Sequence, residues 1–478
     1  MHALLRVEPL PAFSGTFNVP ASKPETQRAI LASTLADGVS RIANPLRCAE
    51  TEAMHEACRT LGAEITDHAG YVEVRGVGGS IRPSRRVIRA GGSALVFRTM
   101  AALASVSPSP VVVTGDATVR RRVMAPLFTA LRDLGAHVEC ICDDGNAPVV
   151  NWGRGLRGGV CELPGDVSSQ FITAILYVAP FATEPVEINV TGELYSLPYI
   201  KQTLTSLRNA GIDVRTSSDY RSYRVTPSRY HPRDVIVEED YTSASYLLAA
   251  AALYPGTSVL ANVHRDSAQG EFAIVPILRR LGLRVRFDEA TSSLVVENDY
   301  GRPRGTVEID TRECPNIVPT LAAIGSYIDG TMRVVGGRLT RFHKASRIEA
   351  MVTELSRAGV DIRVLYDEGV CDGFEVRGAA TYPGGLRFSS WGDHRIFMSL
   401  FVAGLRMESA NTFAGFEGVR LSFPGFFTEF ARAGTRTSVT HDGVAESVAA
   451  GAGEAVNRSG WAGETTTREV ASLCGELS

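Results

Sequence analysis

The sequence lacks the features that mark several large classes of protein. Its eight cysteines are scattered, and only Cys140 and Cys142 are near neighbours, so neither paired zinc-ligand spacing nor a dense disulfide framework is present. The apolar stretches at 172–180 and 246–253 are each too short to span a bilayer, and the N-terminus lacks the basic and then apolar pattern of a signal peptide. We therefore expect a cytoplasmic protein with no membrane contact and no metal.

Strong net charge is also lacking. The 478 residues carry a formal charge of −3, which argues against binding nucleic acid through bulk charge. Any site for an anion must then be a local arrangement of basic side chains. The length suggests about three domains of ~150 residues, which is compatible with two larger α/β domains and a tail.

A phrase in which a helix-like stretch ends in glycine and a strand-like stretch follows occurs six times. The glycines are Gly62, Gly135, Gly211, Gly282, Gly359 and Gly434. Successive glycines are 73, 76, 71, 77 and 75 residues apart. Glycine suits the left-handed position that ends a helix. One copy would mean little, but six copies at nearly one period predict a sixfold helix, turn and strand unit.

The last unit looks incomplete, because the residues after Gly434 are small and polar and show no convincing strand. Two alternating stretches near the N-terminus, at 4–7 and 15–19, are candidates for its missing strands. This closure predicts a discontinuous domain of residues 1–20 and 240–436. Residues 21–239 form an inserted domain, each domain has three units, and residues 437–478 form a disordered tail.

Basic residues recur at expected helix starts, where backbone N–H groups and the helix dipole favour anions. These clusters lie at 20–29, 92–98, 120–122, 341–347 and 393–395. A single cluster of this kind is typical of solvated surface. The alternative is that the clusters converge between two halves of the molecule and form a functional site. Uncharged polar residues at 165–171 and 195–199 either cap helices or hold phosphate and hydroxyl groups.

From about Leu4 to Ala433, the order and spacing of these motifs resemble the enolpyruvyl transferase family, and within it the 5-enolpyruvylshikimate-3-phosphate synthases. The motifs are Ser22-Lys23 with Arg28-Ala29, Thr114-Gly115 with Arg122, Val167-Ser168-Ser169-Gln170-Phe171, Ser196 with Pro198-Tyr199-Ile200, Ser243-Ala244-Ser245-Tyr246, Gln269-Gly270, Arg347, Asp393-His394-Arg395 and Phe423-Pro424. The resemblance implies a two-domain inside-out α/β barrel of six βαβαββ-like repeats. Substrates would bind in the cleft between the domains, which closes on them.

The resemblance also implies a set of ligand contacts, with no cofactor and a monomeric enzyme. The implied phosphoenolpyruvate contacts are Lys23, Arg122, Gln170, Arg347 and Arg395. The implied contacts of a phosphorylated acceptor are Lys23, Arg28, Ser168, Ser169, Gln170, Ser196 and Tyr199. This sorting agrees with the chemistry, because a ligand with two anionic groups needs several fixed cations, and arginine binds phosphate and carboxylate bidentately.

Several positions depart from the family pattern. Asn316 stands where the family has its catalytic Asp, and an amide cannot take a proton from a hydroxyl at neutral pH. His343 and Lys344 replace a Lys-Glu pair, and Leu421 replaces a Lys. The phosphoenolpyruvate loop reads Gly91-Gly92-Ser93-Ala94-Leu95 in place of an Asn-Ala-Gly-Thr run, and Pro24 replaces a substrate-binding Ser.

We therefore take Asn316, His343 and Lys344 as the candidate catalytic positions. His343 is a candidate base or acid, Lys344 a candidate proton donor or phosphate ligand, and Glu313 a candidate replacement for the missing carboxylate. His343 is also compatible with an ordinary cleft or surface role. A related branch of the family uses a cysteine in another loop. That loop corresponds to residues 116–120 here, so Cys314 is expected to be structural.

Three functions follow. The first is transfer of the enolpyruvyl group to shikimate 3-phosphate, or to another cyclic polyol or sugar phosphate in a specialised pathway. The second is a non-catalytic homologue that still binds anions. The third is altered elimination chemistry on the same scaffold.

Overall fold

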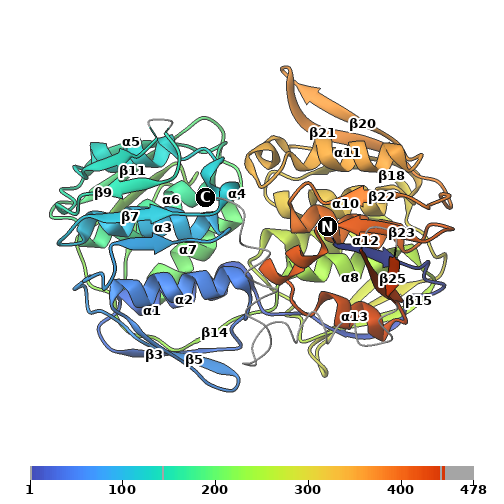
Figure 1. The fold of residues 1–478 in the computed structure, drawn as a ribbon, viewed down its shortest axis with the longest axis horizontal. Helices are drawn as coiled ribbons and strands as arrows, with labels where there is room; N and C mark the ends of the chain where they lie inside the picture. Colours follow the sequence, from blue (N-terminus) through green and yellow to red (C-terminus); the bar gives the residue numbers. More distant parts are fainter. Residues whose placement is uncertain (1–2, 143–144, 442–443, 447–478) are drawn as a thin grey trace.

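The computed structural model describes residues 3–142, 145–441 and 444–446. Two lobes lie side by side (Figure 1). We call residues 21–239 the inserted half and residues 3–20 with 240–446 the discontinuous half. Helices and strands alternate in both, so the predicted α/β class is confirmed. Among these residues, no helix combines the length and the apolar character needed to cross a bilayer.

The inserted half contains three four-stranded sheets, each with two main helices. The first unit has β3 (Val39–Ala43), β4 (Glu64–Asp67), β5 (Tyr71–Arg75), β14 (Val235–Ile236), α1 (Lys23–Leu35) and α2 (Ala49–Leu61). The second has β6 (Val87–Arg89), β7 (Val111–Thr114), β8 (Val138–Cys140), β9 (Val149–Asn151), α3 (Ala94–Leu103), η1 (Ala104–Val106), α4 (Ala117–Arg120) and α5 (Ala125–Asp133). The third has β10 (Gly159–Pro164), β11 (Val186–Thr191), β12 (Val214–Thr216), β13 (Ser222–Val225), α6 (Ser169–Val178), η2 (Ala179–Phe181) and α7 (Leu197–Asn209).

The discontinuous half also contains three units, two with a four-stranded sheet and one with a five-stranded sheet. The fourth unit has β2 (Gly15–Asn18), β15 (Gly256–Ala261), β16 (Arg284–Asp288), β17 (Ser293–Asn298), α8 (Tyr241–Leu253), η3 (Gly270–Ala273) and α9 (Ile274–Arg280). The fifth has β18 (Arg304–Asp310), β19 (Asp329–Val335), β20 (Asp361–Asp367), β21 (Val370–Arg377), η4 (Pro315–Ile317), α10 (Val318–Gly325), η5 (Arg338–Phe342) and α11 (Arg347–Arg357). The sixth has β1 (Ala3–Val7), β22 (Arg387–Ser389), β23 (Asn411–Ala414), β24 (Thr437–His441), β25 (Val444–Glu446), α12 (His394–Gly404), η6 (Phe416–Leu421) and α13 (Phe426–Arg432).

In every unit a parallel strand pair is followed by antiparallel strands, two in the first five units and three in the sixth. The repeated glycines serve the purpose that their spacing predicts. Gly62, Gly135, Gly211, Gly282, Gly359 and Gly434 have φ values of +110°, +92°, +81°, +88°, +89° and +87°. Each follows a helix and precedes the strand at or near its sheet edge. The predicted repeat of three units per half is therefore confirmed.

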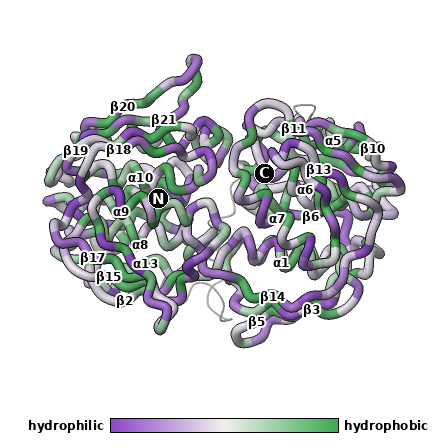
Figure 2. The backbone as a smooth tube through the Cα atoms, turned by 180° about the vertical axis from the view of Figure 1, so that it is seen from behind, coloured by the Kyte–Doolittle hydropathy of each residue, from purple (hydrophilic) through white to green (hydrophobic). Residues whose placement is uncertain are grey.

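The buried apolar residues form two separate clusters. One contains only residues between Ala21 and Val237, and the other contains residues from Leu5 to Val19 and from Tyr241 to Phe430. Both halves accordingly contain hydrophobic segments of their own (Figure 2). The chain crosses between the halves where Ala21 and Glu239 form an isolated antiparallel bridge. These clusters support the predicted domain boundaries, which remain a prediction.

Two expectations about the chain ends were wrong. Residues 437–441 form β24, which pairs antiparallel with β1, and 444–446 form β25 beside it, so the expected disordered tail does not begin at 437. The remainder, 447–478, lies outside the described residues. Only β1 completes the last unit, because β2 joins the fourth sheet in parallel with β15. The free edge of β1 explains the first error, since it offers unpaired backbone groups to a Thr- and Val-containing segment of high β propensity.

Candidate functional site

A polar cavity of about 140 Å³ lies between the two halves. It is lined by every ligand contact that the resemblance implies and by the candidate catalytic positions Asn316, His343 and Lys344. These are Lys23, Arg28, Arg122, Ser168, Ser169, Gln170, Ser196, Tyr199, Asn316, His343, Lys344, Arg347 and Arg395. Because eight of them come from the inserted half and five from the discontinuous half, the cavity exists only where the halves meet.

Helix N-termini account for this convergence. Lys23 begins α1, Ser168 caps α6, Ser196 precedes α7, Arg347 begins α11 and Arg395 lies in the first turn of α12. A helix N-terminus carries partial positive charge and unpaired N–H groups, so each adds to the attraction for anions. The repeated unit thus places the same electrostatic feature at the cleft several times.

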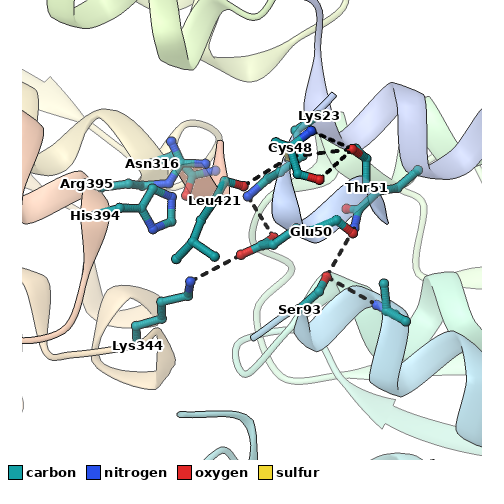
Figure 3. Close-up of polar contacts among 12 residues, drawn as sticks. Lys23, Cys48, Glu50, Thr51, Ser93, Asn316, Lys344, His394, Arg395 and Leu421 are labelled. Atoms are coloured by element: carbon teal, nitrogen blue, oxygen red, sulfur yellow. Dashed lines mark hydrogen bonds and ion pairs between the residues drawn. The ribbon is translucent and has the colours of Figure 1, made fainter. Parts of the chain in front are cut away.

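Glu50, in the first turn of α2, lies between two lysines from opposite halves. Its carboxylate accepts from Lys23 Nζ at 2.8 Å and from Lys344 Nζ at 3.1 Å (Figure 3). Burial alone raises the pKa of Glu50, but the two ammonium groups outweigh burial and lower that pKa to about 2. Glu50 is therefore ionised at neutral pH and fixes both lysines at the cavity wall.

A second cluster of charge surrounds the buried Asp393. Arg347 Nε donates to Asp393 Oδ2 at 2.8 Å, and Asp393 Oδ1 accepts from the backbone N–H of Arg395 at 2.8 Å. Arg347 also donates through Nη1 to Asn316 Oδ1 at 2.9 Å. Asp393 thereby holds Arg347 and Arg395 in place. Its single negative charge compensates only part of the positive charge of the two arginines.

The side chain of Asn316 contacts Tyr199 and Glu271 as well. Its amide nitrogen donates to Tyr199 Oη and, at 3.1 Å, to Glu271 Oε1. Tyr199 in turn donates its hydroxyl proton to Glu271 Oε1 at 2.7 Å. Glu271 is 1% exposed and lies behind these two residues, outside the cavity lining. Burial raises its pKa above the usual carboxyl value.

The uncharged polar wall is held by Arg98, which the sequence places in a basic cluster without a specific role. Arg98 Nη1 donates to Ser168 Oγ at 2.9 Å and to Gln170 Oε1 at 2.8 Å. Ser168 also caps α6 by accepting from the Gln170 N–H at 3.3 Å. The capping and ligand-contact interpretations of this segment are therefore compatible.

Arg28 supports the same wall. Its guanidinium donates to Thr203 Oγ1 at 2.9 Å and to the Tyr199 carbonyl at 3.1 Å. Ser196 has φ of +58°, and its N–H donates across the cleft to the Arg312 carbonyl at 2.9 Å. Both residues thus help to fix the first turn of α7.

Several cavity-lining nitrogens have no partner among the described residues. They are Arg122 Nε, His343 Nδ1 and both ring nitrogens of His394. Burial lowers the pKa of His343 and of His394 well below 6.5, and neighbouring cations lower both further. Both imidazoles are therefore neutral at neutral pH. Buried polar atoms without partners in a cavity are typical of a ligand site.

The two halves touch closely around this cavity. Besides the bonds of Glu50 and Tyr199, Cys48 Sγ donates to the Leu421 carbonyl at 3.3 Å (Figure 3). Arg312 pairs with Glu193 at 2.6 Å on the rim. The structure is thus in a closed arrangement.

Not every basic or acidic candidate reaches the cavity. Of the triplet at 120–122, only Arg122 lines it, while Arg120 and Arg121 are exposed. Glu313 is exposed and outside the lining, so the structure offers no support for its replacing the missing carboxylate. Cys314 is buried, and burial raises the pKa of its thiol, as expected for a structural cysteine.

Sequence reasoning missed three acidic residues of the site. Glu50 and Asp393 hold its cations, and Glu271 contacts Tyr199 and Asn316. Asp393 stands inside a quoted motif, and Glu271 directly follows Gln269-Gly270, so proximity to motifs was an available signal. Glu50 offered none, because an acidic residue in the first turn of a helix is ordinarily explained by the helix dipole.

Known proteins resemble the chain over nearly its whole described length. A family model described as EPSP synthase (3-phosphoshikimate 1-carboxyvinyltransferase) matches residues 7–430. A 3-phosphoshikimate 1-carboxyvinyltransferase of Methanocaldococcus jannaschii is 34% identical over 425 residues, covering 88% of this chain and 96% of that protein. One from Methanothrix thermoacetophila is 37% identical over 428 residues, with 88% and 96% covered. An EPSP synthase structure from Acinetobacter baumannii has a TM-score of 0.74 at 25% identity and covers 92% of this chain and 100% of that one.

Proposed function

Since the chain belongs to the EPSP synthase family, we propose that it transfers the carboxyvinyl group of phosphoenolpyruvate to a hydroxyl of a phosphorylated acceptor and releases inorganic phosphate. Its relatives are named as 3-phosphoshikimate 1-carboxyvinyltransferases, so the first candidate acceptor is shikimate 3-phosphate. Another cyclic polyol or sugar phosphate is the alternative acceptor, because Pro24 and Asn316 depart from the family pattern. The observation that carries the proposal is the pair of cation clusters in one cleft, one for each anionic group of phosphoenolpyruvate.

The cluster around Glu50 suits the phosphate. Lys23, Lys344 and Arg122 all lower the pKa of Glu50 through their charges, so all three lie near one point. Three cations around one carboxylate leave positive charge for a phosphate dianion. Lys344 also supplies the positive charge that is lost where Leu421 replaces a lysine. Both residues reach the same end of α2, since the Leu421 carbonyl contacts Cys48 and Lys344 contacts Glu50.

The cluster around Asp393 suits the carboxylate. Arg347 and Arg395 present planar guanidinium groups, which bind carboxylates bidentately. Arg395 forms no ion pair with any carboxylate of the described residues. Its guanidinium thus lacks a carboxylate partner among these residues and can pair with that of a ligand, while Asp393 fixes its backbone.

The acceptor's phosphate and hydroxyl groups are assigned to the opposite wall. Ser168, Ser169, Gln170 and Ser196 offer hydroxyl and amide groups that hydrogen-bond without adding charge. Tyr199 adds a phenol beside them, and Arg28 holds its backbone. This wall belongs to the inserted half, so closure brings the acceptor against the cations of the discontinuous half.

The reaction needs a proton donor for the methylene carbon and an acceptor for the hydroxyl proton. Burial lowers the pKa of Lys344, which makes its ammonium group a better acid at neutral pH. Burial and neighbouring cations lower the pKa of His343 well below 6.5, so its neutral imidazole is a weak base and does not serve as the proton donor. Asn316 orients groups but cannot take a proton.

We also propose that the protein acts as a monomer in the cytoplasm. Both substrate walls belong to one chain, so a second copy is not needed to complete the site. Cys48, Cys58, Cys161 and Cys371 are buried free thiols, which suits a reducing compartment.

The direct test incubates the full chain with phosphoenolpyruvate and a panel of phosphorylated polyols that includes shikimate 3-phosphate. Released phosphate and the mass of each acceptor are measured together. We expect phosphate release with gain of a three-carbon unit. Binding without release in every case would favour the anion-binding homologue, and an acceptor that changes without gaining carbon would favour elimination.

A matched pair of variants links that activity to the cleft. Arg122→Ala removes a cation from the cavity and should weaken phosphoenolpyruvate binding about 10-fold to 100-fold, as expected for hydrogen bonds to charged groups. Arg121→Ala removes its exposed neighbour and should leave binding unchanged. Equal effects of the two substitutions would count against this site.

A further inference from the structure

Glu271 occupies a place in which it can receive a proton from the cavity. Its Oε1 accepts from Tyr199 Oη at 2.7 Å and from the Asn316 amide at 3.1 Å. Tyr199 and Asn316 line the cavity, whereas Glu271 does not. Any proton that reaches Glu271 from a ligand therefore passes through Tyr199.

The position of Glu271 is fixed by close backbone packing. A Cβ on Gly270 would lie 2.1 Å from the Glu313 carbonyl, so only glycine lets η3 approach the turn before η4 this closely. Gln269, directly before it, accepts from the Tyr241 N–H and donates to the Glu239 carbonyl. Glu271 is thus anchored beside Asn316 and beside the crossing between the halves.

The hydrogen-bond directions suit a relay. Tyr199 donates its only proton to Glu271 and accepts from the Asn316 amide. A phenol oxygen has one further lone pair, which can accept from an acceptor hydroxyl. Asn316 accepts through Oδ1 from Arg347, which sets its amide nitrogen toward the pair.

The same contacts explain why an amide stands at 316. An aspartate there would place a second carboxylate about 3 Å from that of Glu271, and two such groups cannot both ionise. The asparagine donates to Glu271 instead. In this chain the carboxylate beside this turn is therefore that of Glu271.

We propose that Glu271, acting through Tyr199, receives the acceptor's hydroxyl proton in place of a carboxylate at position 316. This rests on the proposed function. The acceptor O–H bond breaks as its proton passes to Tyr199 Oη, and the Tyr199 proton passes to Glu271 Oε1. The oxygen bonds to the enol carbon, and the methylene carbon takes a proton from the Lys344 ammonium.

Elimination restores both groups. Lys344 takes a proton back from the methyl carbon as the C–O bond to phosphate breaks, and the Glu271 proton returns through Tyr199 to the departing phosphate. Glu271 is a positioning residue in this scheme, because Tyr199 alone touches the acceptor. Since Tyr199 and Glu271 belong to opposite halves, the relay forms only when the cleft is closed.

The test compares kcat, KM and their pH dependence for the full chain and its variants, with the acceptor that supports turnover. Glu271→Gln should lower kcat about 100-fold to 10,000-fold, the range of general acid–base catalysis, and remove the acid limb of the pH profile. Phosphoenolpyruvate binding, measured by calorimetry, should change less than about twofold. Glu271→Asp should keep the acid limb, and Tyr199→Phe should lower kcat as Glu271→Gln does.

Position 316 supplies the decisive comparison. Asn316→Asp should reduce activity, whereas Asn316→Asp combined with Glu271→Gln should exceed either single variant, because one carboxylate is then returned to the turn. Glu313→Gln, an exposed carboxylate beside the same turn, is the control and should match the wild type.

The outcomes separate the two proposals. If the wild type turns over and Glu271→Gln keeps its kcat within about threefold with an unchanged pH profile, the relay alone is wrong. If the wild type turns over no acceptor, the proposed function fails and the relay with it.

Discussion

At the scale of single residues, the cations of the cleft depend on buried carboxylates that lie far away in the sequence. Glu50 and Lys344 are 294 positions apart, and Glu271 and Tyr199 are 72 apart. Lys344 contacts Glu50 from the opposite half, so neither residue can be understood from its own segment. A basic cluster in the sequence becomes a binding site only when such partners fix its geometry.

Replacing Glu50 by Gln should destabilise the fold. The change leaves Lys23 and Lys344 buried without their carboxylate, which we expect to lower the free energy of unfolding by about 3–5 kcal/mol. Urea denaturation at pH 7 measures this. Glu56→Gln, which breaks an exposed pair with Arg59, should lower it by less than about 1 kcal/mol. Equal losses for the two variants would contradict the role of Glu50.

The pH dependence of that loss has a definite sign. The pKa of Glu50 is lowered from 4.5 to about 2 in the folded state. A carboxyl with a depressed pKa contributes stability above its unfolded pKa, and this contribution declines as pH falls toward the folded pKa. The difference between wild type and Glu50→Gln should therefore be complete above pH 4.5 and shrink progressively toward pH 2. A difference that grows on acidification would refute this.

His343 and His394 should remain neutral in the ligand-free protein. Burial, followed by nearby cations, lowers the pKa of each imidazole well below 6.5. Nitrogen chemical shifts of labelled histidine should show neutral rings for both from about pH 8 down to 6.5, the ordinary pKa of the imidazole. Assignment by His343→Asn and His394→Asn identifies the signals. Protonation of either ring between about pH 6 and pH 7 would show that the cations lie elsewhere.

The cation positions could be predicted from the sequence because motif order and spacing carry them. The sequence also makes Lys344 a candidate proton donor, whereas the role proposed for Glu271 could not be predicted from it. Glu271 contacts Tyr199 across the boundary between the halves. In the sequence, Asn316 indicates only the loss of a charge, whereas in the structure its amide donates to Glu271. Local patterns contain no information about such distant partners.

At the scale of helices and strands, the repeat could be predicted from the sequence because each unit needs a glycine where its helix ends. Positive φ is required at that position whatever the surrounding packing. Strand β24 was missed for the opposite reason. Its Thr- and Ser-rich segment shows no apolar pattern, and it becomes a strand because β1, more than 400 residues earlier, offers an edge.

Gly282 provides a direct test of the turn. It has φ of +88°, and nothing lies within 4 Å of the position its Cβ would occupy. Gly282→Ala should thus cost only the left-handed backbone strain, about 1–2 kcal/mol, and Gly282→Asn should cost less. Gly425 has φ of −79°, so Gly425→Ala should be nearly neutral. Thermal denaturation compares the three, and a neutral Gly282→Ala would argue against the strain.

At the scale of the whole molecule, two cores with separate residue sets should allow one half to fold alone. The buried cluster of the inserted half contains only residues from Ala21 to Val237. Its ends meet at the bridge between Ala21 and Glu239, so a chain of residues 21–239 needs no new closure. We expect this fragment to show dispersed amide NMR signals and cooperative unfolding. A fragment with collapsed dispersion would contradict the proposed domain boundary.

The cleft itself is a property of the closed molecule. Both walls, both cation clusters and the contact between Tyr199 and Glu271 require the two halves together. The resemblance predicted the place of this cleft and most of its lining. It could not predict how buried carboxylates would redistribute charge after the changes at Asn316, Lys344 and Leu421, because that depends on three-dimensional neighbours.

The most direct measurement is the mass of a phosphorylated acceptor after incubation of the full chain with phosphoenolpyruvate, with released phosphate counted in the same reaction. Our account predicts an acceptor that has gained one three-carbon carboxyvinyl group for each phosphate released. Phosphate release without a heavier acceptor, or no change with any acceptor on the panel, would contradict it.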